Sequence, residues 1–366
     1  MSLATGSTSE RPQTANLLAL AAESDPSVTE RTLEFWRHEG LLPRPQRDGQ
    51  SGKTPVWTYP PETTSQLREL LRLRDHTKDL NVLRAALWFE GYPVDTATAR
   101  MSISAYLRQL RDVCERELQK RSSGAEGPEA RKQAIRAVAQ VLARKRGKAF
   151  PRLSRQTLDE RTDAIALMLT LILGEEPGTP ELEAHGHAVE RLIGVERGRR
   201  YRPAGSDPWL AGPPEEGLQG FAAVGSLPRL IAVVDSASEQ DLQAARTLAS
   251  TLLRGISAVS RIADAMVGRD NASGLAGMAL LHDGDPQAGL IVVALVLSIL
   301  SSSKLAANLS EVVDALEGNI LPLENRLKAL ATLPEAEQAE RLTHLEQLPF
   351  AEKVGIKRLL IEFRPR

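Results

Sequence analysis

The sequence predicts a mainly all-α fold, with one small β-hairpin near the N-terminus and a large helical-bundle region in the C-terminal part. Only 4% of the residues are aromatic, while alanine and leucine are abundant, which favours packed helices over sheets. Apolar residues recur at spacings of three and four along most of the chain. One stretch is typical of a hairpin tip, with Gly49, Ser51 and Gly52 between two short arms.

The composition is that of a globular protein without an overall positive field. Hydrophobic residues make up 42% of the 366 residues, charged residues make up 25%, and the formal net charge is −1. A chain of this length typically holds two or three domains. Because the net charge gives no general attraction to nucleic acid, any such binding depends on a local basic patch.

Several features favour a cytoplasmic protein with no membrane partner. Cys114 is the single cysteine, which excludes an intramolecular disulfide and is typical of a reducing compartment. The N-terminus lacks the charged and then apolar pattern of a signal peptide. The uncharged apolar run at 288–300 is shorter than the about 20 residues that cross a bilayer, so we expect a buried core helix there.

The first domain is expected at residues 16–94, after a small, polar and disordered tail at residues 1–15. Its second helix has Thr29 as N-cap, an apolar side made by Leu33, Phe35 and Trp36, and Gly40 at its C-terminus. Arg31 and Arg37 are expected to project from this short capped helix, a shape that fits the major groove of DNA.

A hairpin is expected at 44–59, with Arg44, Arg47 and Lys53 on its arms. Such a basic two-stranded wing can straddle a phosphate backbone. The alternative is an ordinary solvated loop, and the neighbouring helices favour the wing.

These residues resemble the mercury-resistance-regulator (MerR) type of winged helix-turn-helix over roughly residues 16–94, about a quarter of the chain. The matching groups are Thr32–Leu33, Phe35–Trp36, Gly40–Leu41–Leu42–Pro43 and Tyr59–Pro60–Pro61–Glu62. Glu34 stands where that family usually has arginine, and Val56–Trp57–Thr58 stands where an arginine-containing strand is usual. Both departures remove positive charge from the expected DNA-binding face.

The resemblance implies a transcriptional regulator that binds double-stranded DNA. We expect Arg31 and Thr29 to reach base edges, and Arg37, the Trp36 ring and the basic hairpin residues to hold phosphates. The candidate DNA-binding residues are Thr29, Arg31, Thr32, Phe35, Trp36, Arg37, Arg44, Arg47, Lys53, Trp57 and Tyr59. The alternative is a protein-interaction scaffold whose winged domain docks a protein, which Glu34 and Val56–Trp57–Thr58 favour.

A connecting helix at 95–122 follows, and the resemblance implies that it makes a homodimer. Its apolar stripe consists of Ile103, Tyr106, Leu107, Leu110, Val113, Cys114 and Leu118. The stripe covers only about two and a half heptads, which is short for a coiled coil. The alternative is a helix packed on the C-terminal part of its own chain.

After a linker at 121–128, we expect a helical region at 129–200 and a helical-bundle domain at 221–366. The glycine- and proline-rich stretch at 195–225 is predicted to be an irregular connector. Within the bundle, helices are expected at 240–267, 275–281, 289–300, 309–316, 321–333, 342–350 and 354–363, joined by short turns. A small-molecule or protein effector would act on this C-terminal part.

The sequence has no motif of a known catalytic or metal site, so we expect no enzyme activity, no catalytic residue, no metal and no cofactor. It lacks a glycine-rich phosphate loop, His-Glu-x-x-His, paired cysteines and Gly-x-Ser-x-Gly. His185 and His187 are two residues apart on an expected helix, so they point to different sides. The polar stretches at 268–271 and 282–285 could belong to an active site, but their Asp, Asn and Gly residues are equally typical of turns between helices.

Overall fold

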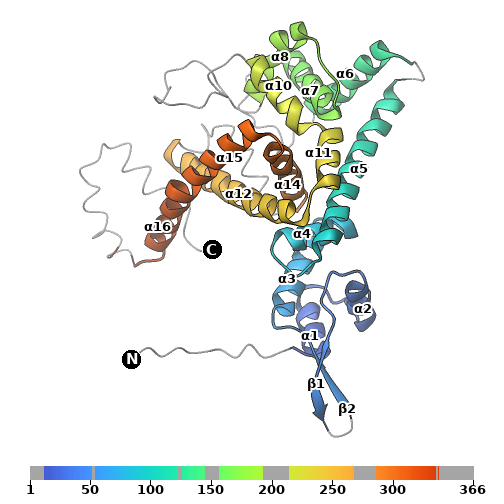
Figure 1. The fold of residues 1–366 in the computed structure, drawn as a ribbon, viewed down its shortest axis with the longest axis vertical. Coiled ribbons are helices and arrows are strands. Elements are labelled where there is room, and N and C mark those ends of the chain that lie inside the picture. The colour runs from blue at the N-terminus through green and yellow to red at the C-terminus, as the bar shows by residue number, and fades with distance from the viewer. Residues whose placement is uncertain are drawn as a thin grey trace. The chain divides into compact units, whose positions relative to one another are not determined.

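The computed structural model describes residues 12–51, 54–122, 126–144, 156–192, 214–267, 286–334 and 337. It is mostly helical, with one two-stranded sheet, which confirms the mainly all-α prediction (Figure 1). The chain divides into two compact units. Unit 1 consists of Met1–Tyr106 and Asp285–Leu290, and unit 2 consists of Leu107–Gly284 and Ile291–Arg366.

Unit 1 combines a β-hairpin with short helices and the beginning of a long one. Its elements are α1 (Thr14–Ser24), α2 (Glu30–His38), β1 (Gln46–Ser51), β2 (Thr54–Thr58), α3 (Thr63–Arg74), α4 (Leu80–Phe89) and the first part of α5 (Thr96–Arg121). The core is built from side chains of every described helix in this set: Leu17, Leu33, Leu67, Leu83, Trp88 and Ile103 are all at most 1% exposed.

The first helix of unit 1 begins earlier in the chain than the sequence predicts. Helix α1 begins at Thr14, inside the tail expected at residues 1–15. Pro12 is buried, and its carbonyl oxygen accepts a hydrogen bond from the Tyr59 amide at 2.8 Å. A backbone bond to the residue after the hairpin orders residues whose polar composition alone predicts disorder.

A distant segment completes unit 1. Helix α14 (Pro286–Leu300) begins there, and Gly289 lies so close to Phe89 that an added Cβ would be 3.1 Å from the ring. Tyr106 donates a hydrogen bond to Gln287 at 3.2 Å. Further along α14, Leu290, Val293 and Ala294 are fully buried, as predicted for a core helix.

Among the described residues, no single helix has the length and apolar composition to cross a membrane. One pair of consecutive segments, Glu216–Gly225 and Leu227–Ser236, meets those two criteria together, with a bend of 45° between them.

In unit 2 the end of α5 packs against α6 (Pro128–Arg144) and α7 (Leu158–Leu173). Leu118 joins residues of α6 and α7 in one buried cluster, with Cys114 packed against it. In the earlier turns of α5, Ile103 and Leu107 are 0% exposed. Part of the expected stripe is therefore buried within this chain, while Val113 is 42% exposed. The homodimer stays a prediction.

The next cluster of unit 2 joins α6 and α7 to α8 (Thr179–Leu192) and α10 (Pro214–Gly225). The connector expected through residue 225 is thus wrong from Pro214 onward. Leu218, Phe221 and Ala222 lie at helical spacing and pack against this cluster, so apolar burial outweighs the helix-breaking glycines. Helix α7 ends as predicted at Gly174, whose φ of 81° is the left-handed conformation that suits glycine.

The remaining described elements are α11 (Leu227–Ser236), α12 (Glu239–Val267), α15 (Ser303–Ala315), the π-helical segment η2 (Leu316–Ile320) and α16 (Leu321–Ala331). The turn expected between residues 316 and 321 does not exist, because α15, η2 and α16 follow without a break. Pro322 explains the π segment, since it has no N–H and its ring would clash with the carbonyl of Gly318 in a regular α-helix. The helices expected at 275–281, 342–350 and 354–363 lie outside the described residues.

Candidate nucleic-acid interface

Helix α2 is capped at its start by two threonines. The Thr32 amide donates to Thr29 Oγ1, and the Thr29 amide donates to Thr32 Oγ1, both at 3.3 Å. Glu30 in the first turn and Arg37 in the last turn suit the helix dipole. The predicted N-cap is confirmed, and it commits both hydroxyl groups to the helix end.

The two sides of α2 differ sharply in chemistry. Leu33 is 0% exposed and Trp36 is 2% exposed, so this side faces the core. The opposite side carries the exposed side chains Arg31, Glu34, Phe35 and His38. The expectation that Phe35 lies on the apolar side is wrong: it is two residues from Leu33, about 200° around the helix, and is 47% exposed.

Trp36 and Tyr59 do not take the roles that the sequence suggests. Tyr59 is 1% exposed, and the buried Trp36 ring lies under the Arg74 guanidinium, 4.7 Å from the ring centroid. Neither ring is available to a duplex. Both side chains instead stabilise the position of α2 through their contacts with Arg37 and Arg74.

Arg37 is also a positioning residue rather than a free phosphate contact. Its Nη1 donates to Tyr59 Oη at 2.7 Å, its Nη2 lies 3.6 Å from Glu34, and its side chain is only 17% exposed. These contacts connect the C-terminal half of α2 to the residue that follows β2. The expectation that Arg37 holds a phosphate is therefore corrected.

The hairpin brings Arg47 and Trp57 together. They are direct cross-strand partners, and both are exposed, Trp57 at 52%. Cross-strand partners project from the same face of a hairpin. The register shifts between Arg47 and Gln50, where Gly49 has a φ of 121°, and Thr58 fixes this region by donating to Asp48 at 3.1 Å. Lys53 lies outside the described residues.

The arginines of unit 1 fall into two groups. Arg72 pairs with Glu69, and Arg84 pairs with Glu39 and donates to the Glu39 carbonyl at 2.7 Å. In the part of the chain that the structure describes, Arg31, Arg44 and Arg47 are exposed and make no ion pair or hydrogen bond. These three side chains, together with Arg68 of α3, which is likewise exposed and unpaired among the described residues, are available to an anionic partner.

Two supports of the interface were not identified from the sequence. Gln66 on α3 donates to the Leu41 carbonyl at 2.9 Å, and the Arg84–Glu39 pair fixes the end of α2 to α4. Both bridge residues 25 or more positions apart. No local pattern in the sequence marks such partners.

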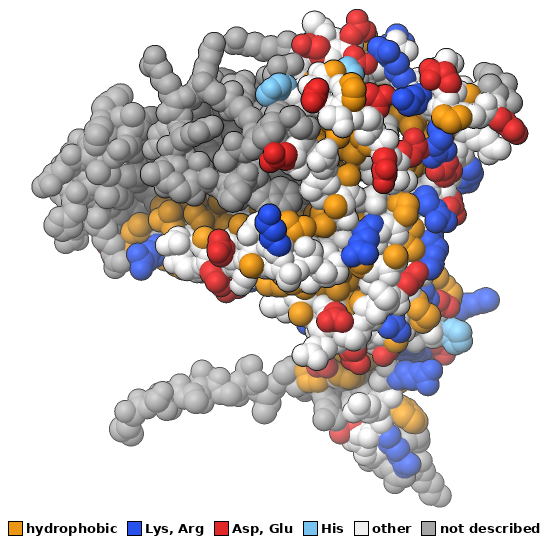
Figure 2. Space-filling view, turned by 45° about the horizontal axis from the view of Figure 1, so that its top comes forward, with side chains coloured by type: hydrophobic (Ala, Val, Ile, Leu, Met, Phe, Trp, Pro, Cys, Tyr) orange, Lys and Arg blue, Asp and Glu red, His pale blue; other side chains and the backbone are white. Residues whose placement is uncertain are grey.

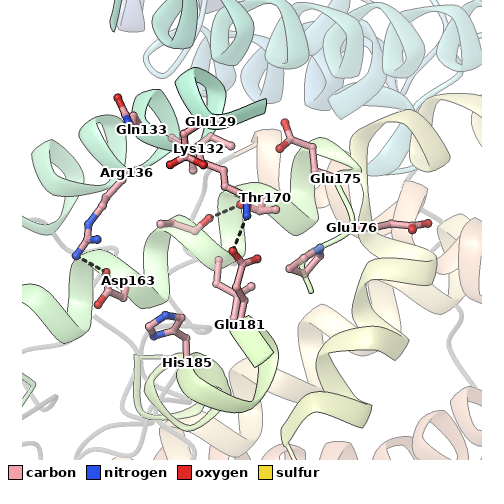
Figure 3. A pocket seen from close by; sticks show the side chains of 14 residues that line it. Glu129, Lys132, Gln133, Arg136, Asp163, Thr170, Glu175, Glu176, Glu181 and His185 are labelled. Carbon is pink, nitrogen blue, oxygen red and sulfur yellow. Dashed lines mark hydrogen bonds and ion pairs between the residues drawn. The ribbon is translucent and has the colours of Figure 1, made fainter. Parts of the chain in front are cut away.

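A concave region lies in unit 2, between α6, α7 and α8, and has a volume of about 310 Å³ (Figure 3). Its lining carries five acidic side chains and two basic ones, and both basic side chains form ion pairs within it. Lys132 bonds Glu181 at 2.8 Å, and Arg136 bonds Asp163 at 3.0 Å. Lys132 also lowers the pKa of the Glu181 carboxyl below its ordinary value. Within the described ranges, no group of three or more His, Cys, Asp or Glu side chains is placed to hold a metal ion.

No protein-family model, curated protein or solved structure matches this chain significantly.

Proposed function

We propose that unit 1 is a winged helix-turn-helix domain of MerR-like type that binds double-stranded DNA, and that the chain is a transcriptional regulator. In this proposal α1 and α2 form the helix-turn-helix, α2 enters the major groove, and the β1–β2 hairpin is the wing. The helical region of unit 2 would carry the regulatory or oligomerisation role, including any small-molecule or protein effector.

The observation that carries the proposal is that the Arg31 side chain is exposed and, in the described part of the chain, unpaired. It projects from the outward side of a capped helix whose inner side is fixed by Trp36 and Arg37. A guanidinium presented by a rigid short helix can bond the O6 and N7 atoms of guanine. Arg44 and Arg47, which follow Arg31 in the sequence, are also exposed and unpaired among the described residues. They can contact phosphates.

The second candidate is a protein-docking scaffold. Phe35 and Trp57 are large, exposed apolar side chains in unit 1, and exposed apolar residues also mark protein interfaces. Glu34 reduces the positive charge on the outward side of α2, which further favours this rival.

The two candidates are separated by selecting duplexes from a random-sequence DNA library with the purified full chain. We expect enrichment of specific sites, and Arg31→Ala should reduce cognate affinity by roughly 1–3 kcal/mol while leaving binding to random DNA nearly unchanged. Arg47→Ala should weaken both kinds of duplex equally.

The matched control is Arg254→Ala, which removes an exposed, unpaired arginine from α12 in unit 2. It should bind as the parent chain does. Equal losses for Arg31→Ala on cognate and random DNA would contradict base reading by Arg31, and a library without enrichment would favour the scaffold.

A further inference from the structure

The outward side of α2 is narrow and chemically simple. Successive residues of an α-helix are about 100° apart, so Arg31 and Phe35 project within about 40° of each other, opposite the buried Leu33. They are also one turn apart along the axis. This side therefore presents one cation and one apolar ring next to each other.

The neighbouring side chains do not change this pattern. Glu34 lies toward Arg37, with 3.6 Å between its Oε1 and the guanidinium. His38 has its Nδ1 3.4 Å from Glu39 at the far end of the helix. Arg31 and Phe35 remain as the adjacent outward pair that has no partner among the described residues.

The Phe35 ring has no hydroxyl group and cannot read a base edge by hydrogen bonding. In the major groove, the one apolar group that distinguishes bases is the C5 methyl of thymine, and a phenyl ring is a suitable partner for it. Cytosine has hydrogen at the same carbon. An exposed phenylalanine on a groove-reading helix therefore favours thymine at its contact position.

The spacing relative to Arg31 fixes where this thymine lies. Four residues of helix span about 6 Å, and bases of one strand are about 3.4 Å apart along the duplex axis. The contact of Phe35 therefore falls within about two base pairs of the contact of Arg31.

We propose that α2 reads a guanine through Arg31 and a thymine methyl group through Phe35, within about two base pairs of each other. This inference rests on the proposed DNA-binding function and adds a specificity-determining residue to it.

The test uses the preferred duplex selected by the full chain. Each thymidine is replaced in turn by 2′-deoxyuridine, which removes the methyl group and keeps the base pair. At one position near the Arg31-dependent guanine, we expect about fourfold weaker binding, the effect of removing one buried methyl-sized group. With Phe35→Ala, the same replacement should have no effect at that position.

Phe35→Leu is the matched variant, because it keeps an apolar side chain and should retain part of the sensitivity to the methyl group. Phe35 is half-exposed, so neither substitution removes a core side chain. Tryptophan fluorescence of each variant checks that unit 1 remains folded, because Trp36, Trp57 and Trp88 lie in it.

The outcomes separate the inference from the function on which it rests. If duplexes are enriched but every deoxyuridine is tolerated, or if Phe35→Ala keeps the full sensitivity, the methyl contact is overturned while DNA binding stands. If no duplex is enriched, the proposed function fails and the inference fails with it.

Discussion

Arg37 shows how single side chains position α2. Its guanidinium bonds the Tyr59 hydroxyl at 2.7 Å and stacks at 5.9 Å from the centroid of the same ring, while Arg74 covers Trp36. Each cation meets an aromatic residue from another segment of unit 1. These contacts fix α2 without using Arg31, Arg44 or Arg47, which remain available for a partner.

At this scale we predict that Tyr59→Phe destabilises unit 1 by about 1–2 kcal/mol, because a mostly buried guanidinium loses its hydrogen-bond acceptor while the ring packing is kept. Urea unfolding followed by tryptophan fluorescence measures this, since Trp36, Trp57 and Trp88, three of the four tryptophans, lie in unit 1. Tyr92→Phe makes the same chemical change at a weaker 3.3 Å bond to the Ser65 carbonyl and should cost less than about 0.5 kcal/mol. Equal losses for both variants would refute the role of the Arg37–Tyr59 bond.

At the scale of the elements, features that depend on neighbouring residues could be predicted from the sequence, whereas features that depend on long-range contacts could not. The Thr29 cap and the buried Leu33 could be predicted, because capping and helical periodicity depend on neighbouring residues. The partner of Arg37 could not, because Tyr59 is 22 residues away. Similarly, the α5 stripe was recognised as apolar, but nothing in its spacing distinguishes burial against α6 and α7 from burial against a second copy.

The contact between α12 and η2 gives a second prediction. A Cβ added to Gly255 would lie 2.6 Å from a terminal carbon of Leu316 and 2.9 Å from its Cγ, so the whole leucine side chain must move. Alanine gains up to about 1 kcal/mol of helix propensity, but overpacking costs about 1–3 kcal/mol. We expect Gly255→Ala to destabilise unit 2 and Leu316→Ala to be less harmful in its presence. A double-mutant cycle measures the coupling between the two substitutions from their unfolding free energies. If the effects were simply additive, the contact between Gly255 and Leu316 would not be tight.

The junction of α5 and α6 gives a pH-dependent prediction. Arg131 donates to both oxygens of Glu115, at 2.8 and 2.9 Å, and this lowers the pKa of the Glu115 carboxyl below its ordinary value of 4.5. A lowered pKa means that the pair contributes stability above that ordinary value and loses it as the pH falls through the folded-state pKa.

Both partners are partly exposed, so we expect Glu115→Gln to cost less than about 1 kcal/mol at neutral pH. The difference in unfolding free energy between this variant and the parent chain should disappear as the pH falls through the folded-state pKa of Glu115. Urea unfolding at a series of pH values measures it. Glu117→Gln, on the same helix but paired with the exposed Lys120, serves as the comparison and should show a smaller difference. If the difference in unfolding free energy between Glu115→Gln and the parent chain grew in acid, the assigned ion pair would be contradicted.

At the scale of the whole molecule, basic and acidic residues are nearly equal in number, 46 against 47. Basic and acidic side chains are interspersed over the face in Figure 2, in agreement with the net charge of −1. DNA binding by such a chain depends on a few local contacts, and bulk attraction contributes little.

This balance predicts a shallow salt dependence. Each neutralised phosphate contributes about −0.9 to the slope of log K against log salt concentration. Phosphate contacts by Arg44, Arg47 and Lys53 would give a slope near −3 for one chain on DNA and near −5 for a homodimer on two half-sites. Titration of a labelled duplex at several salt concentrations, with sedimentation to count chains, distinguishes these cases. A slope near zero would argue against phosphate contacts altogether.

Unit 1 is discontinuous in sequence, since its last part is the segment Asp285–Leu290 that packs Gly289 against Phe89. During synthesis, the ribosome must add the residues between 106 and 285 before this segment exists. At about 5–20 residues per second, that interval lasts roughly 10–40 s. The nascent N-terminal portion therefore waits with Phe89 uncovered, and a fragment ending at residue 106 would keep that apolar surface permanently open to self-association or chaperone capture.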